Sequence, residues 1–234
     1  MATQKALLFD VFGTLVDWRR SIAREVEATL GTHDEPIDGF AFADAWRAQY
    51  QPAMDEVRSG RLPFSRLDAL HRRNLDVVLQ AFGLDHVDEA TRVRLNLAWH
   101  RLDAWPDAKP GLDRLRGRFR IAPCSNGNIS LMVDLARHNG FAWDAILGAE
   151  LARDYKPKPI VYLAAVAALD CAPGEATMVA AHPSDLAAAA RAGLRTAFVE
   201  RPDEFGPGRG DRLGDLRVDH SVAGIEALAQ ALGT

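Results

Sequence analysis

Short apolar runs alternate with stretches of helical periodicity along most of the chain. The apolar runs predict strands at residues 5–10, 119–125, 145–147, 177–181 and 195–199, with a weaker strand at 218–221. The stretches with helical periodicity between these runs are residues 129–138, 159–169, 184–192 and 223–232. This alternation is typical of the α/β class, so we expect a Rossmann-like, doubly wound parallel sheet.

A long helical segment separates the first two predicted strands. Residues 19–100 have a mainly helical pattern, whereas a crossover between parallel strands needs only about a dozen residues. We therefore expect a helical cap domain of residues 18–100, inserted into an α/β core domain of residues 1–17 and 101–234. The chain should leave the core through residues 15–17 and return through residues 104–106.

Polar side chains follow three of the predicted strands. Asp10 ends the first strand, Ser125-Asn126 lies at the end of the second, and the segment 182–185 follows the fourth. Open α/β sheets bind ligands beyond the carboxyl ends of their strands, so these groups should share one crevice. Thr14 is placed to hydrogen-bond the Asp10 carboxylate and fix its orientation. The alternative is that Asp10 only caps a helix beginning near Thr14.

A lysine is held in the stiff segment Tyr155-Lys156-Pro157-Lys158-Pro159. A residue before proline is restricted toward extended conformation, which favours a fixed direction for its side chain. If Lys156 faces Asp10, it lowers the pKa of that acid and keeps it ionised, as a nucleophile requires. The alternative is a solvated loop lysine, and Lys158 fits that description better.

Four segments of the chain, taken together, resemble the motifs of the haloacid dehalogenase superfamily. Asp10-Val11-Phe12-Gly13-Thr14, Ser125-Asn126, Lys156 and Asp185 match its four motifs in order and spacing, over nearly the entire chain. Within the superfamily, the chain is most similar to the L-2-haloacid dehalogenase branch. The segments that carry this similarity are FDVFGTLVDW, PCSNGN, YKPKPIVY and SDLAAAARAGLRTAFV.

Two positions separate this chain from the phosphatases of the superfamily. Those enzymes carry a second acid two residues after the nucleophile, where this chain has Phe12, which transfers no proton. They also carry a magnesium-binding aspartate at the position that aligns with Ala181. A hard cation prefers oxygen ligands, and neither Phe12 nor Ala181 supplies one from its side chain. The resemblance therefore implies an enzyme without a metal ion or other cofactor.

The resemblance implies hydrolysis of small 2-haloacids through an aspartyl ester. Asp10 would attack the halogen-bearing carbon, and Thr14 and Lys156 would hold Asp10 in place. Arg47 and Asn126 would receive the departing halide, because negative charge develops there in the transition state. Ser125 would bind the substrate carboxylate, and Asp185 would activate the water that hydrolyses the ester. The expected substrates are haloacetates and 2-halopropionates, and fluoroacetate is a candidate.

Several of these residues have a structural alternative. Arg47 lies in an amphipathic helix, where arginines are commonly solvated. Phe12 and Phe64 fall where the branch has pocket aromatics, but aromatics at helical spacing also form cores. Tyr162 fits a branch tyrosine that braces the lysine region, and packing against the sheet would explain it equally well.

The fourth motif departs from the branch pattern, which commonly reads Ser-Ser-Asn-Ala-Trp-Asp. Here the segment is Ala180-Ala181-His182-Pro183-Ser184-Asp185, so a histidine replaces the asparagine and a serine replaces the tryptophan. His182 could act as a general base in ester hydrolysis, because the ordinary pKa of histidine lies near neutrality. The alternative is a hydrogen-bonded structural histidine.

Composition limits the remaining classes of protein. The chain has 234 residues, a formal net charge of -4 and no basic stripe, so nucleic acid is not an expected partner. No segment is apolar enough for a signal peptide or a membrane span, which favours a cytoplasmic enzyme. Cys124 and Cys171 lack metal-binding spacing. The segment 201–210, rich in Gly and Pro, reads as a surface loop.

Other classes of protein fit the same residues. A phosphatase or a C–N hydrolase of the superfamily would keep Asp10 and Lys156, and so would a non-catalytic binding module on the same fold. The resemblance is compatible with a homodimer, for which the sequence indicates no face.

Overall fold

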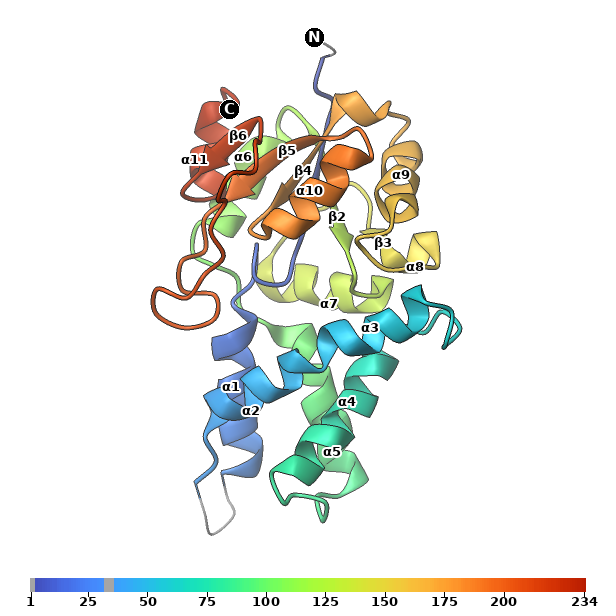
Figure 1. Ribbon diagram of the computed structural model, residues 1–234. Coiled ribbons are helices and arrows are strands. Elements are labelled where there is room, and N and C mark those ends of the chain that lie inside the picture. The colour runs from blue at the N-terminus through green and yellow to red at the C-terminus, as the bar shows by residue number, and fades with distance from the viewer. Residues whose placement is uncertain (1–2, 32–35) are drawn as a thin grey trace.

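A six-stranded parallel sheet forms the centre of the molecule (Figure 1). The computed structural model describes residues 3–31 and 36–234; residues 1–2 and 32–35 of the predicted core and cap ranges lie outside it. The strands are β1 (Ala6–Phe9), β2 (Arg120–Ser125), β3 (Leu147–Gly148), β4 (Ala176–Ala180), β5 (Arg195–Val199) and β6 (His220–Val222). They lie in the order β3-β2-β1-β4-β5-β6, and all neighbours are parallel, which confirms the expected α/β class.

Both faces of the sheet are buried, because successive side chains of a strand point to opposite faces. In β1, Leu7 and Phe9 belong to one core cluster, whereas Ala6 and Leu8 belong to the other. The first cluster includes side chains of α6 (Ala108–Arg116), α7 (Ile129–Asn139) and α11 (Ile225–Ala231). The second includes side chains of α9 (Pro159–Ala168) and α10 (Pro183–Arg191). Burying each Leu or Phe contributes about 1.5–3 kcal/mol, so the apolar strands specify the sheet strongly.

A group of helices lies beyond the carboxyl end of β1 (Figure 1). These cap helices are α1 (Trp18–Leu30), α2 (Gly39–Ala48), α3 (Tyr50–Arg58), α4 (Leu67–Ala81), α5 (Glu89–Asn96) and the 3-10 helix η1 (Leu97–Arg101). Three fully buried tryptophans hold them together: Trp99 stacks on Trp18 and meets Trp46 edge-on. The remaining short helices of the chain are α8 (Ala149–Ala152) and η2 (Pro173–Glu175).

The two segments that connect the cap helices to the sheet run side by side. Val16 and Ala104 form an antiparallel bridge, and the Trp105 N–H donates to the Leu15 carbonyl at 2.9 Å. The Asn139 side chain of α7 accepts from the Ala104 N–H and donates to the Leu102 carbonyl. These bonds fix where the cap helices sit relative to the sheet.

The capping alternative for Asp10 is wrong. The chain turns at residues 13–15, and the first helix begins only at Trp18. The residue that caps this helix is Asp17, whose side chain accepts from the Arg20 N–H at 3.1 Å. Asp10 therefore has its carboxylate available for another purpose. Within residues 3–31 and 36–234, no helix is long and apolar enough to cross a membrane.

Candidate active site

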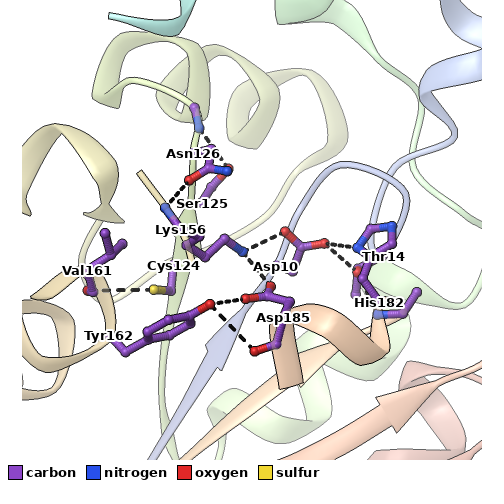
Figure 2. A network of polar contacts seen from close by, with 12 residues as sticks. Asp10, Thr14, Cys124, Ser125, Asn126, Lys156, Val161, Tyr162, His182 and Asp185 are labelled. Atoms are coloured by element: carbon purple, nitrogen blue, oxygen red, sulfur yellow. Dashed lines mark hydrogen bonds and ion pairs between the residues drawn. The ribbon is translucent and has the colours of Figure 1, made fainter. Parts of the chain in front are cut away.

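Four loops bring charged and polar side chains together at the carboxyl ends of the central strands (Figure 2). Asp10 follows β1, Asn126 follows β2, Lys156 precedes α9, and His182 and Asp185 begin α10. The site faces a cavity of about 770 Å³ between the sheet and the cap helices. Its lining includes Asp10, Phe12, Arg47, Tyr50, Gln51, Asp55, Arg58, Asn126, Lys156, Lys158, His182, Ser184, Asp185, Phe205 and Asp211.

Lys156 bridges two carboxylates inside the protein. Its Nζ lies 2.9 Å from Asp10 Oδ1 and 2.6 Å from Asp185 Oδ2, and the residue is only 6% exposed. Burial alone would lower the pKa of Lys156, but the two carboxylates outweigh burial and raise it well above its ordinary value. The Lys156 N–H donates to Asn126 Oδ1, and its carbonyl accepts from Arg58. The ammonium group is therefore charged and fixed in position.

Asp10 is held ionised by groups on both of its oxygens. Oδ1 accepts from Lys156, and Oδ2 accepts from the Thr14 hydroxyl at 2.7 Å and from His182 Nδ1 at 3.1 Å. Burial would raise the pKa of this carboxyl, but Lys156 and His182 hold it well below its usual range. The Thr14 hydroxyl itself accepts from the Ala181 N–H at 2.9 Å, so its proton faces Asp10.

Asp185 is oriented by two donors. Its Oδ2 accepts from Lys156, and its Oδ1 accepts from the Tyr162 hydroxyl on α9. Tyr162 is fully buried, and its ring packs in the core cluster beneath the sheet. Both readings of this tyrosine therefore apply, because the ring packs on the sheet while the hydroxyl braces the acid next to Lys156.

Glu204 is a buried acid that was not among the site residues predicted from the sequence. It lies in the loop after β5 and is 1% exposed. His182 Nε2 lies 3.0 Å from Glu204 Oε2 and 3.1 Å from Oε1, and Trp18 Nε1 donates to Oε1. Gly13 makes room for this carboxylate, because a Cβ added there would lie 2.0 Å from Glu204 Oε1.

His182 lies between two carboxylates, those of Asp10 and Glu204. Burial alone would lower the pKa of the imidazole, but the two acids outweigh it and hold the pKa well above its ordinary value. The charged imidazolium donates from both nitrogens and has no lone pair with which to accept a proton. The geometry thus favours a donor over a general base in the enzyme before it reacts.

The expectation that residues 201–210 form a surface loop is wrong in part, since Arg201, Glu204 and Gly206 are buried. Arg201 and Glu204 are both buried, because each has a charged partner inside the molecule. The Arg201 guanidinium binds both oxygens of Asp107 and also donates to the Thr14 carbonyl. The loop after β5 is therefore one wall of the site, and its Phe205 packs against Trp18.

Arg47 reaches the cavity from α2. Its guanidinium lies over the rings of Tyr50, at 4.0 Å from the centroid, and of Trp18, at 5.3 Å. Its Nη1 atom is buried and has no hydrogen-bond partner among the described residues. A fully solvated arginine is therefore ruled out, and a buried cationic donor lies at the cavity without an acceptor.

Of the other predicted site residues, Phe12 lies at the cavity, whereas Phe64 and Ser125 do not. Phe12 lines the cavity and meets Tyr50 and Trp99 edge-on. Phe64 does not line it, because its ring packs against Tyr155 instead. Ser125 is fully buried outside the cavity lining, and its hydroxyl accepts from the Gly127 N–H at 3.0 Å. Phe64 and Ser125 were expected to contact the substrate, but neither residue lines the cavity.

No group of three or more His, Cys, Asp or Glu side chains that could hold a metal ion occurs in the described part of the chain. The cation between Asp10 and Asp185 is the ammonium of Lys156. Lys158 also lines the cavity, but its Nζ pairs with Asp154 at 2.8 Å. Of the thiols, Cys124 is buried, and burial raises its pKa to about 12.

The aspartate–lysine pair lies at the carboxyl end of β1, where the cap helices lie beyond the edge of the parallel sheet. Residues 4–193 match the family model described as haloacid dehalogenase-like hydrolase, and the chain belongs to this family. (S)-2-haloacid dehalogenase 1 of Pseudomonas sp. (strain CBS-3) is 29% identical over 209 residues, which cover 86% of this chain and 88% of that protein.

Two solved structures are more similar in sequence. The crystal structure of the defluorinating L-2-haloacid dehalogenase Rha0230 is 45% identical, covers 99% of this chain and 96% of its own, and superposes with a TM-score of 0.95. That of the L-2-haloacid dehalogenase PA0810 is 44% identical, covers 98% of both chains, and has a TM-score of 0.93.

Proposed function

We propose that this protein is a hydrolytic dehalogenase of small (S)-2-haloacids that works through an ester on Asp10. The observation that carries the proposal is the buried Lys156 ammonium, which lies between Asp10 and Asp185 and keeps the nucleophile charged. Phe12 and Ala181 stand where phosphatases of the family have a second acid and a metal ligand. The names of the relatives support the same reaction and the same class of substrate.

In the first half-reaction, Asp10 displaces the halide from carbon. The carboxylate is aimed by Lys156 and Thr14, so little reorganisation is needed when it attacks. Negative charge develops on the departing halogen, and the unpartnered Arg47 donor at the cavity is suited to receive it. Asn126 also lines the cavity, but its Oδ1 is committed to the Lys156 N–H, which leaves its amide nitrogen as the available donor.

In the second half-reaction, water hydrolyses the ester. Asp185 is the acid best placed to accept the proton of this water, because it lines the cavity beside Asp10 and is fixed by Lys156 and Tyr162. The products are the 2-hydroxyacid and halide. We propose haloacetates and 2-halopropionates as substrates, with no metal ion or organic cofactor taking part.

The test is halide release from chloroacetate and fluoroacetate, each with and without EDTA. The proposal predicts one halide and one hydroxyacid per substrate, at a rate that EDTA leaves unchanged. Release of phosphate from phosphate esters that depends on magnesium would instead identify a phosphatase. If neither haloacid is turned over and no ester forms on Asp10, the dehalogenase assignment is wrong.

Arg47→Ala should weaken catalysis more for fluoroacetate than for chloroacetate. Fluoride is the poorer leaving group, so its transition state depends more on the cationic donor. We expect kcat/KM to fall about 10²-fold for chloroacetate and further for fluoroacetate. The matched control is Arg61→Ala, which removes an exposed arginine that does not line the cavity. Equal losses for both substrates would show that Arg47 does not contact the halogen.

A further inference from the structure

The two oxygens of Asp10 have different surroundings. An ionised carboxylate has about four lone-pair sites, two on each oxygen. Among the described residues, Oδ1 accepts one hydrogen bond, from Lys156, whereas Oδ2 accepts two, from Thr14 and His182. Oδ1 therefore keeps a free lone pair and is the atom that attacks carbon. Oδ2 then becomes the carbonyl oxygen of the ester.

The two donors at Oδ2 are each fixed by a further contact. The Ala181 N–H donates to Thr14 Oγ1, which leaves the Thr14 hydroxyl proton for Asp10. Glu204 binds His182 Nε2 with both of its oxygens, which leaves Nδ1 to face Asp10. Trp18 donates to the same Glu204 and holds it in place. These groups aim two proton donors at one oxygen atom before any reaction takes place.

We propose that the Thr14 hydroxyl and His182 Nδ1–H form an oxyanion hole at Asp10 Oδ2 for ester hydrolysis, with Glu204 as the positioning residue that keeps His182 a proton donor. The inference rests on the proposed function and assigns residues to its second half-reaction. An oxyanion hole works by placing donors where charge develops in the transition state. In this step the charge develops on Oδ2.

Ester hydrolysis restores the free carboxylate of Asp10. The oxygen of water attacks Cγ of Asp10, its proton passes to Asp185, and the carbonyl electron pair moves onto Oδ2. The intermediate collapses when the Cγ–Oδ1 bond breaks, and Oδ1 leaves as part of the hydroxyacid. The departing oxygen takes the proton back from Asp185, and Lys156 is bound at that oxygen. Asp10 is restored with one oxygen from water and releases its second proton to solvent.

Glu204 matters most once the ester exists. Before the reaction, His182 faces two carboxylates, Asp10 and Glu204, and Lys156 and Asp185 lie on the far side of Asp10. Ester formation removes the charge of Asp10, and Glu204 is then the carboxylate left in contact with His182. Without it, a buried imidazole loses its proton, and Nδ1 can present a lone pair to Oδ2 in place of a proton.

The experiment compares the two half-reactions in a Glu204→Gln variant. Rapid-quench halide release measures attack on carbon, and mass spectrometry of the Asp10 peptide measures the ester. We expect a burst of one chloride per protein from chloroacetate, an Asp10 peptide heavier by one carboxymethyl group, and ester hydrolysis about 10²-fold slower. The control is Glu200→Gln, an exposed acid at the end of β5, which should behave as the parent.

Thr14→Val provides a second variant should Glu204→Gln not fold. It removes the other donor to Oδ2 and should also accumulate the ester, whereas Thr14→Ser, which keeps the hydroxyl, should accumulate less ester than Thr14→Val. Parent-like turnover of Glu204→Gln without ester would overturn the inference. So would equal slowing of both half-reactions in a folded Glu204→Gln variant. If the parent protein itself releases no halide, the proposed function fails and the inference fails with it.

Discussion

We expect an Asp10→Asn variant to release halide from chloroacetate at about 10⁻⁴ of the parent rate or less. The amide is a poor nucleophile, and effects of this size are typical when a covalent nucleophile is removed. The variant should form no ester on residue 10, which mass spectrometry of the intact protein after incubation with substrate can measure. Asparagine keeps the volume of the side chain, so the loss is chemical.

The control for this result is Asp113→Asn on α6. Asp113 is an exposed acid that pairs with Lys109 at the surface and does not line the cavity. It should keep the parent rate within about twofold, since exposed ion pairs contribute little. Halide release by a folded Asp10→Asn variant at a rate close to the parent would mean that another group attacks the substrate.

The Lys156→Met variant should lose both activity and stability. Removing the ammonium leaves the carboxylates of Asp10 and Asp185 buried side by side without their shared cation. Breaking a buried pair in this way costs about 3–5 kcal/mol, because the remaining charge is uncompensated. We expect halide release to fall by about 10³-fold, and urea unfolding at neutral pH should show the loss of stability.

The pH dependence gives a second measure of the same variant. In the folded parent protein, the pKa of Asp10 lies well below its usual range. The ionised carboxylate therefore stabilises the fold fully when the pH is above the pKa of Asp10 in the unfolded chain. This stabilisation is lost as the pH falls through the pKa of Asp10 in the folded protein. Without Lys156, burial and the neighbouring negative charge raise the pKa of Asp10. The residual activity should therefore increase with pH, whereas the parent keeps its activity into the mildly acid range.

Lys158→Met is the matched control, two residues away in the same loop. Its side chain is 41% exposed and pairs with Asp154. We expect no more than about 1 kcal/mol of destabilisation, as is usual for a surface pair. If both lysine variants behaved alike, the charge of the loop, and not the bridge at Asp10, would be responsible.

The sequence predicted the sheet and the groups at its edge because both are local features. An apolar run followed by Asp10, or by Ser125-Asn126, marks the end of a buried strand, and parallel strands place all such ends at one edge. The short strand β3 was the hardest to place. It was expected at residues 145–147 but is Leu147–Gly148, because only two residues pair with β2.

Glu204 could not be found in this way. Its loop has the Gly and Pro content of a surface turn, and no spacing in the sequence links it to His182 or Trp18. The one available signal was that it follows the end of β5. A buried acid among turn residues becomes recognisable only when a partner for its charge is seen in space.

The cap helices limited the prediction for a different reason. Which face of a helix meets the cavity depends on its rotation and on the helices packed beside it, and the periodicity alone fixes neither. Tyr50 lies at the cavity, whereas Phe64 packs against Tyr155. Arg47 has the same local pattern as a solvated arginine, and only the rings of Trp18 and Tyr50 distinguish it.

The strand order has a consequence for how the protein is made. β1 is the first of the six strands to be synthesised, yet it pairs with β2 and β4. Ala6 of β1 lies opposite Arg120 of β2 and Ala176 of β4. Contacts this distant in the chain form late in folding, so the apolar β1 segment stays unpaired while most of the polypeptide leaves the ribosome. Lys156 is also synthesised long after Asp10, so the ion pair that holds the Asp10 carboxylate can form only when most of the polypeptide has been made.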